Sequence, residues 1–164
     1  MAHVPADIAV RLAPLYAARG RKVLFETESG CPPSGHETVR SRFDASRGVA
    51  WISLDRVAGG SFDAIQAAIQ ALESSVSAAT LFIDLPIDDP GCCGLAASLL
   101  SEGLRLAGIG PRFRAVDDER RAEDVLRFQA NPAPVDLAGL VVEGDLGRGL
   151  ADTVLGSEGS IRRS

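Results

Sequence analysis

Apolar residues recur at helical spacing in four segments of the chain, which predicts helices at residues 5–20, 61–76, 94–104 and 146–156. Pro14 falls inside the first pattern and is expected to kink or shorten that helix, because a proline removes a backbone donor from the helix interior. The pattern at 61–76 is the clearest. Its apolar residues share one helical face: Phe62, Ile65, Ile69, Leu72 and Val76.

Strands are predicted where apolar residues alternate with polar ones or form a short continuous run. Residues 49–54 read as a buried strand, and residues 79–86 are apolar enough to be buried on both faces. Weaker patterns predict further strands at 22–28, 37–43, 105–109 and 124–129, and a short strand-like piece within 135–145.

The order of these elements predicts a mixed α/β sheet with one continuous core. Strand 49–54, the following helix and strand 79–86 form a crossover unit, so the two strands are expected to be parallel. Strands 105–109 and 124–129 are compatible with an antiparallel pair. We interpret the charged segment between them, 116–124, as a solvated loop.

The 164 residues predict a single domain over 1–156 and a polar tail at 157–164. The formal net charge is −5 and no run of Lys and Arg is long, which argues against nucleic-acid binding. The N-terminus lacks the pattern of a signal peptide, and no apolar run approaches the ~18 residues of a membrane span. We therefore expect a cytoplasmic protein with neither a nucleic-acid nor a membrane partner.

The cysteines and histidines predict neither a disulfide framework nor a metal site. Cys92 and Cys93 are adjacent, and neighbouring residues rarely bridge. They lie at the expected start of a helix, where a thiolate would be favoured, but no histidine can be placed beside them as a base. We interpret both as small buried residues and His36 as a solvated loop residue.

The segment DRVAGGS, residues 55–61, lies between a predicted strand and a predicted helix, and two interpretations of it are open. A helix N-terminus presents backbone N–H groups to a phosphate, and Arg56 would add a charged fork. Alternatively, Gly59 and Gly60 form an ordinary turn and Ser61 caps the helix.

The order strand, glycine-containing loop, helix, strand, helix, strand, strand resembles the second half of the GCN5-related N-acetyltransferase (GNAT) fold. RVAGGS is similar to that family's loop for the pyrophosphate of acyl-CoA, with Arg56, Gly59 and Ser61 at its key positions. The resemblance implies a central mixed sheet flanked by helices, and acetyl-CoA or another acyl-CoA as cofactor. It also implies that the acyl thioester lies along splayed central strands, with its pyrophosphate at residues 56–61. The cofactor-binding residues that it implies are Ile52, Leu54, Arg56, Val57, Ala58, Gly59, Gly60 and Ser61.

A narrower resemblance covers residues 49–130, where LFIDLPIDDP, LLSEGLRLAGIGPRF and DVLRFQ occur in order. These motifs are similar to those of a bacterial GNAT-like domain that is often fused to an anti-sigma-factor-type ATPase domain. GNAT enzymes commonly use a tyrosine of the fourth-helix region as general acid. The equivalent segment here, 91–103, contains no tyrosine, and Tyr16 lies in the first predicted helix.

Three carboxylates are candidates for proton transfer. Asp84 lies near the end of strand 79–86, where ligands tend to bind in open α/β sheets, and it could accept a proton from an amine. Glu26 and Glu28 alternate onto one face of strand 22–28, and in an acetyltransferase a strand glutamate can act as general base through water. Asp89 is interpreted instead as a cap of the turn before the next helix.

Two functions are compatible with these features. The first is an acyl-CoA-dependent N-acyltransferase with a small-molecule or protein amine as acceptor, which Arg56 and Gly59 favour. The alternative is a non-catalytic GNAT-like regulatory module that binds a ligand or a signalling-protein partner, which the missing tyrosine favours. A homodimer is compatible with either function.

Overall fold

The computed structural model describes residues 1–28, 30, 37–115 and 122–130. Within these ranges the chain forms a five-stranded sheet, a separate pair of short strands and three helices. The elements in chain order are β1 (Ala2–His3), α1 (Ala6–Ala18), β2 (Phe25–Glu26), β3 (Val39–Asp44), β4 (Val49–Leu54), α2 (Ser61–Ser75), β5 (Thr80–Pro86), α3 (Cys92–Ser101), β6 (Arg105–Ala115) and β7 (Ala122–Ala130).

The strand order of the large sheet is β3-β4-β5-β7-β6. β4 and β5 are parallel, whereas the pairs β3–β4, β5–β7 and β6–β7 are antiparallel. The parallel crossover unit is therefore confirmed, and so is the antiparallel pairing of the two closing strands. The mixed α/β architecture, a central sheet flanked by helices, is the one that the sequence predicted.

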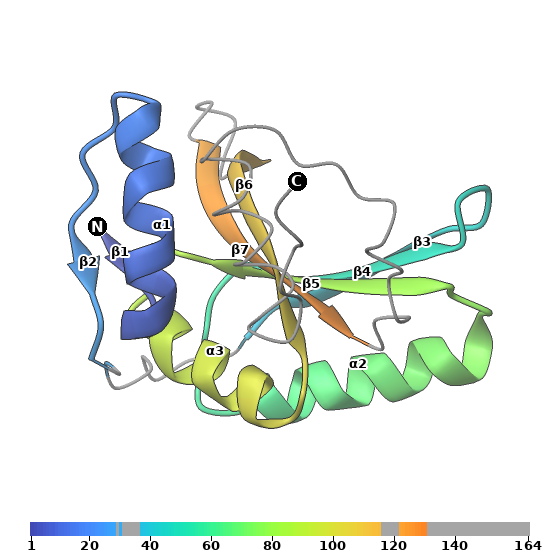
Figure 1. The fold of residues 1–164 in the computed structure, drawn as a ribbon. Helices are drawn as coiled ribbons and strands as arrows, with labels where there is room; N and C mark the ends of the chain where they lie inside the picture. The colour runs from blue at the N-terminus through green and yellow to red at the C-terminus, as the bar shows by residue number, and fades with distance from the viewer. Residues whose placement is uncertain (29, 31–36, 116–121, 131–164) are drawn as a thin grey trace, which may run out of the picture.

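The core lies between the sheet and two of the helices. Figure 1 shows α2 and α3 along the same side of the sheet. Ile52, Ile83 and Phe128 lie opposite one another on β4, β5 and β7, and each is 0% exposed. Helix α1 stands near β1 and β2 (Figure 1), and its Ile8 and Leu12 belong to the same core cluster. The predicted continuous core is thus confirmed for the described residues.

Several predicted boundaries are wrong. The predicted strand 22–28 contributes only the two residues of β2, which pair with β1 and not with the large sheet. Helix α1 continues through Pro14, which is exposed, so the predicted shortening of the helix at this residue does not occur. β6 extends to Ala115, well beyond the predicted end at residue 109. The elements predicted within 131–164 lie outside the described residues.

Candidate functional site

The loops that follow β4 and β5 meet through the carboxylate of Asp89. Its Oδ2 accepts a hydrogen bond from the backbone N–H of Val57 at 3.0 Å, and its Oδ1 accepts one from the backbone N–H of Gly91 at 2.8 Å. We call this pair of hydrogen bonds the Asp89 clamp. The bond to Gly91 confirms that Asp89 caps the turn before α3, and the bond to Val57 adds a cross-link that the sequence did not predict.

Side-chain packing closes the same junction. A Cβ atom placed on Gly91 would lie 2.6 Å from Cγ1 of Val57, so no side chain fits at this position unless Val57 moves. Val57 and the neighbouring Ala58 are 2% and 4% exposed. The loop after β4 therefore packs directly on the loop after β5, with no space for a ligand chain between them at this point.

The start of α2 differs from the predicted serine cap. Gly60 occupies the N-cap position, and Ser61 is the first residue of the helix, so the interpretation of Ser61 as the cap is wrong. Ser61 is fully buried, and its hydroxyl accepts a hydrogen bond from the backbone N–H of Ala58 at 2.8 Å. Two backbone N–H groups of the predicted phosphate loop, those of Val57 and Ala58, are therefore already bonded to side chains.

A carboxylate lies beside the same helix terminus. A Cβ atom on Gly60 would meet Oε1 of Glu37 at 3.1 Å, so this side chain sits against the first turn of α2. A negative charge there is stabilised by the positive end of the helix dipole and opposes the approach of a pyrophosphate. Arg56 and Gly59 are exposed on the same loop, and space is open around Gly59.

The strand residues predicted to contact a cofactor face the core or lie inside a continuous ladder. Ile52 and Leu54 are 0% and 1% exposed, respectively. The pairing of β4 with β5 runs as far as Ser53 opposite Asp84, and the Asp89 clamp joins the two chains beyond it. An acyl-CoA lying between splayed central strands, as the GNAT resemblance implies, does not fit this arrangement.

Asp84 forms an ion pair instead of facing an open site. Both of its carboxylate oxygens accept hydrogen bonds from Arg127 of β7, each at 2.7 Å, and the residue is 5% exposed. This bidentate geometry occupies the oxygens that a general base would need. An amine could use Asp84 only after Arg127 had moved away.

The structure does not bring the two predicted glutamates to the large sheet. Glu26 lies in β2 opposite His3, and Glu28 follows that strand; both are exposed. Asp84 belongs to the other sheet. Asp84 and Glu26 thus lie on separate sheets, and Glu28 lies outside both.

The adjacent cysteines are buried free thiols, as predicted. Burial raises the pKa of Cys92 well above its usual value, so the thiol stays protonated at neutral pH. Cys93 donates from Sγ to the backbone oxygen of Thr27 at 3.3 Å. Cys31 and His36 lie outside the described residues.

A buried polar cluster links α1 to β7, and the sequence did not predict it. The hydroxyl of Tyr16 donates to Oδ2 of Asp124 at 2.6 Å, and Arg21 donates to both oxygens of the same carboxylate at 2.8 and 3.1 Å. Asp124 is 8% exposed and lies in β7, so it belongs to the strand predicted at 124–129 and not to the solvated segment predicted over 116–124. The available signal was the single tyrosine of the chain, placed on the apolar face of a predicted helix.

Comparison with known proteins finds one solved structure with a partly similar fold and no related sequence. No family model and no curated protein sequence matches the chain. A solved structure of a GCN5-related N-acetyltransferase from Brucella melitensis is similar at a TM-score of 0.41 and 16% identity. The match covers 57% of this chain and 42% of that one, so the chain spans less than half of its length. We therefore derive the function from this chain's own residues.

Two classes of feature are absent from the described part of the chain. No helix there is long and apolar enough to cross a membrane. No group of three or more His, Cys, Asp or Glu side chains there is arranged to hold a metal ion.

Proposed function

We propose that this chain is a GNAT-like regulatory module that binds a ligand or a partner protein without transferring an acyl group. The observation that carries the proposal is the Asp89 clamp, which joins the loops after β4 and β5 through Val57 and Gly91. In the GNAT arrangement implied by the sequence, the acyl chain would pass between these strands. Here that path is closed by hydrogen bonds and by the packing of Val57 on Gly91.

The state of the candidate catalytic groups supports the same proposal. Asp84 is paired with Arg127, and Glu26 lies on the other sheet. The single tyrosine, Tyr16, bonds to Asp124 in the interior and does not face the loop at 55–61. No described residue among the predicted sites is therefore positioned to exchange a proton with an acceptor amine.

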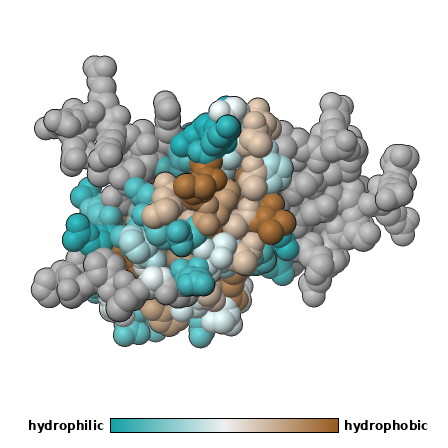
Figure 2. All heavy atoms as spheres, turned by 90° about the vertical axis from the view of Figure 1, so that its left-hand side faces the viewer, coloured by the Kyte–Doolittle hydropathy of each residue, from teal (hydrophilic) through white to brown (hydrophobic). Residues whose placement is uncertain are grey.

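A regulatory role agrees with the resemblance to domains that accompany signalling ATPases, which would act in the cytoplasm. The side of α1 and β2, which faces the viewer in Figure 2, carries apolar areas among polar ones. Val10 of α1 is 75% exposed and Leu24, next to β2, is 78% exposed. The proposed protein partner is either a signalling protein or a second copy of this chain, and these two side chains are the candidate contacts on this side.

An acyl-CoA-dependent N-acyltransferase remains a second candidate because of one observation. Arg56 and Gly59 keep the spacing of the pyrophosphate loop, and both are exposed at the N-terminal end of α2. For this function, Glu37 would have to leave Gly60 and the Asp89 clamp would have to open.

Calorimetric titration of acetyl-CoA into the full chain distinguishes the two candidates. Wild type, Arg56→Ala and the clamp variant Asp89→Ala are compared, with Asp88→Ala as the matched control because its side chain is exposed. The proposal expects no binding by the wild type at millimolar acetyl-CoA. Micromolar binding that Arg56→Ala weakens about tenfold, equivalent to ~1.4 kcal/mol, would establish the acyl-CoA site, and transfer of the acetyl group to an amine by the same protein would reject the proposal.

A further inference from the structure

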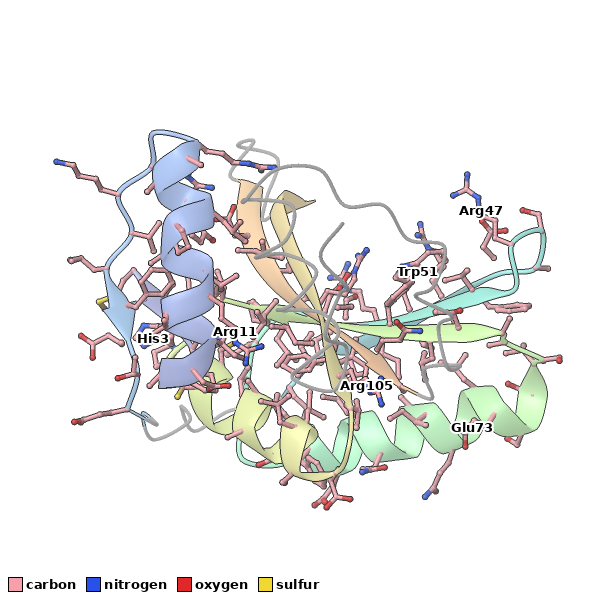
Figure 3. The ribbon with its side chains drawn as sticks, viewed as in Figure 1. His3, Arg11, Arg47, Trp51, Glu73 and Arg105 are labelled. Atoms are coloured by element: carbon pink, nitrogen blue, oxygen red, sulfur yellow. The ribbon has the colours of Figure 1, made fainter. Side chains whose placement is uncertain are left out.

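One face of the large sheet carries a row of arginine and aromatic side chains. Arg42 of β3 lies opposite Trp51 of β4, Trp51 opposite Phe82 of β5, and Phe82 opposite Gln129 of β7. Directly opposed residues of neighbouring strands place their side chains on the same face. We call Arg42, Trp51, Phe82 and Gln129 the arginine–aromatic row. Figure 3 shows that Trp51 lies on the side of β4 turned away from α2.

The cations of this face stack on its rings. The guanidinium carbon of Arg42 lies 4.5 Å from the centroid of Trp51, and that of Arg127 lies 5.2 Å from the centroid of Phe82. A guanidinium placed over an aromatic ring still carries N–H groups that it can direct to solvent or to a ligand. The row is therefore prearranged to receive another flat, electron-rich group.

A surface depression of about 710 Å³ lies at one end of the row. Its lining includes Arg42, Trp51 and Arg127 together with Asp44 and Arg47 of the β3–β4 turn. Figure 3 shows Arg47 at this turn, above the same side of the sheet as Trp51. This site is an open depression of the surface and not an enclosed cavity.

The charges of the depression leave a local excess of positive charge in a chain of net charge −5. Arg127 is neutralised by Asp84. Asp44 accepts hydrogen bonds from the backbone N–H and the hydroxyl of Ser46, and lies 3.9 Å from Arg47. Within the described ranges, no carboxylate forms a salt bridge with Arg42. A ligand bound here is thus expected to bring negative charge.

We infer that this depression binds a nucleoside phosphate. Its base stacks on the guanidinium–indole pair of Arg42 and Trp51, and its phosphate accepts hydrogen bonds from Arg42 and Arg47. Stacking on a ring selects a flat ligand, and the guanidinium fork selects a phosphate, so together they favour a molecule that carries both groups. The inference deepens the proposed function by naming the ligand of the binding module, and it rests on that function.

The test uses the fluorescence of Trp51, the single tryptophan of the chain, together with calorimetry. The probes are ADP, adenosine and inorganic pyrophosphate, each titrated into the full-length wild type, Arg42→Ala and Arg105→Ala. Arg105 is the matched control because it lies opposite Gln129 on the same face but about 19 Å from Arg42, four inter-strand spacings away. Each substitution removes one exposed arginine, so a general effect of charge changes both variants equally.

We expect ADP to bind wild type and Arg105→Ala alike, to change the fluorescence of Trp51, and to bind Arg42→Ala about tenfold more weakly, because a charge-assisted contact is lost. Adenosine and pyrophosphate are each expected to bind more weakly than ADP. The inference is overturned if ADP does not bind at millimolar concentration, if Arg42→Ala binds it as well as wild type does, or if pyrophosphate alone binds as tightly as ADP.

The outcome separates this inference from the proposed function. Acetyl transfer to an amine that depends on Arg56 would reject the non-catalytic module, and the effect of Arg42→Ala on ADP binding would still test the depression separately. If Arg42→Ala binds ADP as tightly as wild type does, the depression is not the nucleotide site. The proposed function, which is based on the closed junction of β4 and β5, is not tested by that result.

Discussion

Asp89 and Val57 are 32 residues apart in sequence, and a hydrogen bond of 3.0 Å joins the carboxylate of one to the backbone N–H of the other. This bond lies where the parallel strands β4 and β5 end, which is the position expected for a ligand in an open α/β sheet. The same carboxylate also holds the turn that begins α3, through the backbone N–H of Gly91. One side chain therefore orients both loops and closes the path between them.

Replacing Asp89 by alanine should destabilise the fold. The backbone N–H of Val57, which belongs to a buried residue, would lose its acceptor, and the cost of such a loss is about 1–3 kcal/mol. Urea denaturation of wild type, Asp89→Ala and the exposed control Asp88→Ala measures the effect. Equal midpoints for all three proteins would show that the clamp contributes nothing to stability.

Gly91→Ala should destabilise the protein by about 1–3 kcal/mol, because the added methyl group overlaps Val57. Gly59→Ala is the control on the same pair of loops, since a Cβ there meets no atom within 4 Å. Thermal unfolding of wild type and the two single variants measures the loss. A Gly59→Ala variant that loses as much stability as Gly91→Ala would contradict the packing argument.

Asp84→Ala should cost about 2–3 kcal/mol of unfolding free energy, because it leaves the guanidinium of Arg127 without its bidentate partner in a largely buried position. The contrasting variant is Asp55→Ala. Asp55 forms a salt bridge with Arg40, whose side chain is 70% exposed, so this variant should lose less than about 1 kcal/mol of unfolding free energy. Chemical denaturation of both variants gives the two values. A similar loss for both would mean that burial of the Asp84 pair has no energetic effect.

The stability of the protein should fall at alkaline pH. Burial raises the pKa of both the Cys92 thiol and the Tyr16 hydroxyl, so the folded protein keeps two protons that the unfolded chain releases near about pH 8.5 and 10. The two retained protons contribute fully to the stability of the fold below about pH 8.5, and this contribution is lost progressively as the pH rises.

Unfolding free energies measured under reducing conditions between neutral pH and pH 11 check this expectation. Cys92→Ala should reduce the fall in unfolding free energy that begins near about pH 8.5. Tyr16→Phe should reduce the further fall that begins near about pH 10. Curves for the variants that run parallel to the wild-type curve would show that neither proton is retained on folding.

Local patterns were enough to predict the secondary structure of the central region and the parallel pairing of strand 49–54 with strand 79–86. The helical pattern of 61–76 and the apolar runs at 49–54 and 79–86 are local signals, and they required a parallel crossover unit. The burial of Cys92 and Cys93 also followed from residue type and position, and so did the turn made by Asp89. Periodicity and turn chemistry act over a few residues, so they can be seen without a structure.

The tertiary structure alone decided what the polar side chains do, since each depends on a partner distant in the chain. The sequence alone could not distinguish Asp84 from a general base, because its ion-pair partner Arg127 is 43 residues away. It also could not pair Tyr16 with Asp124, which is 108 residues away. The strand that contains Glu26 carries a plausible alternating pattern, but pairing with β1 places it outside the large sheet. Which side chains meet depends on the order and register of the strands, and the local pattern of residues does not specify either.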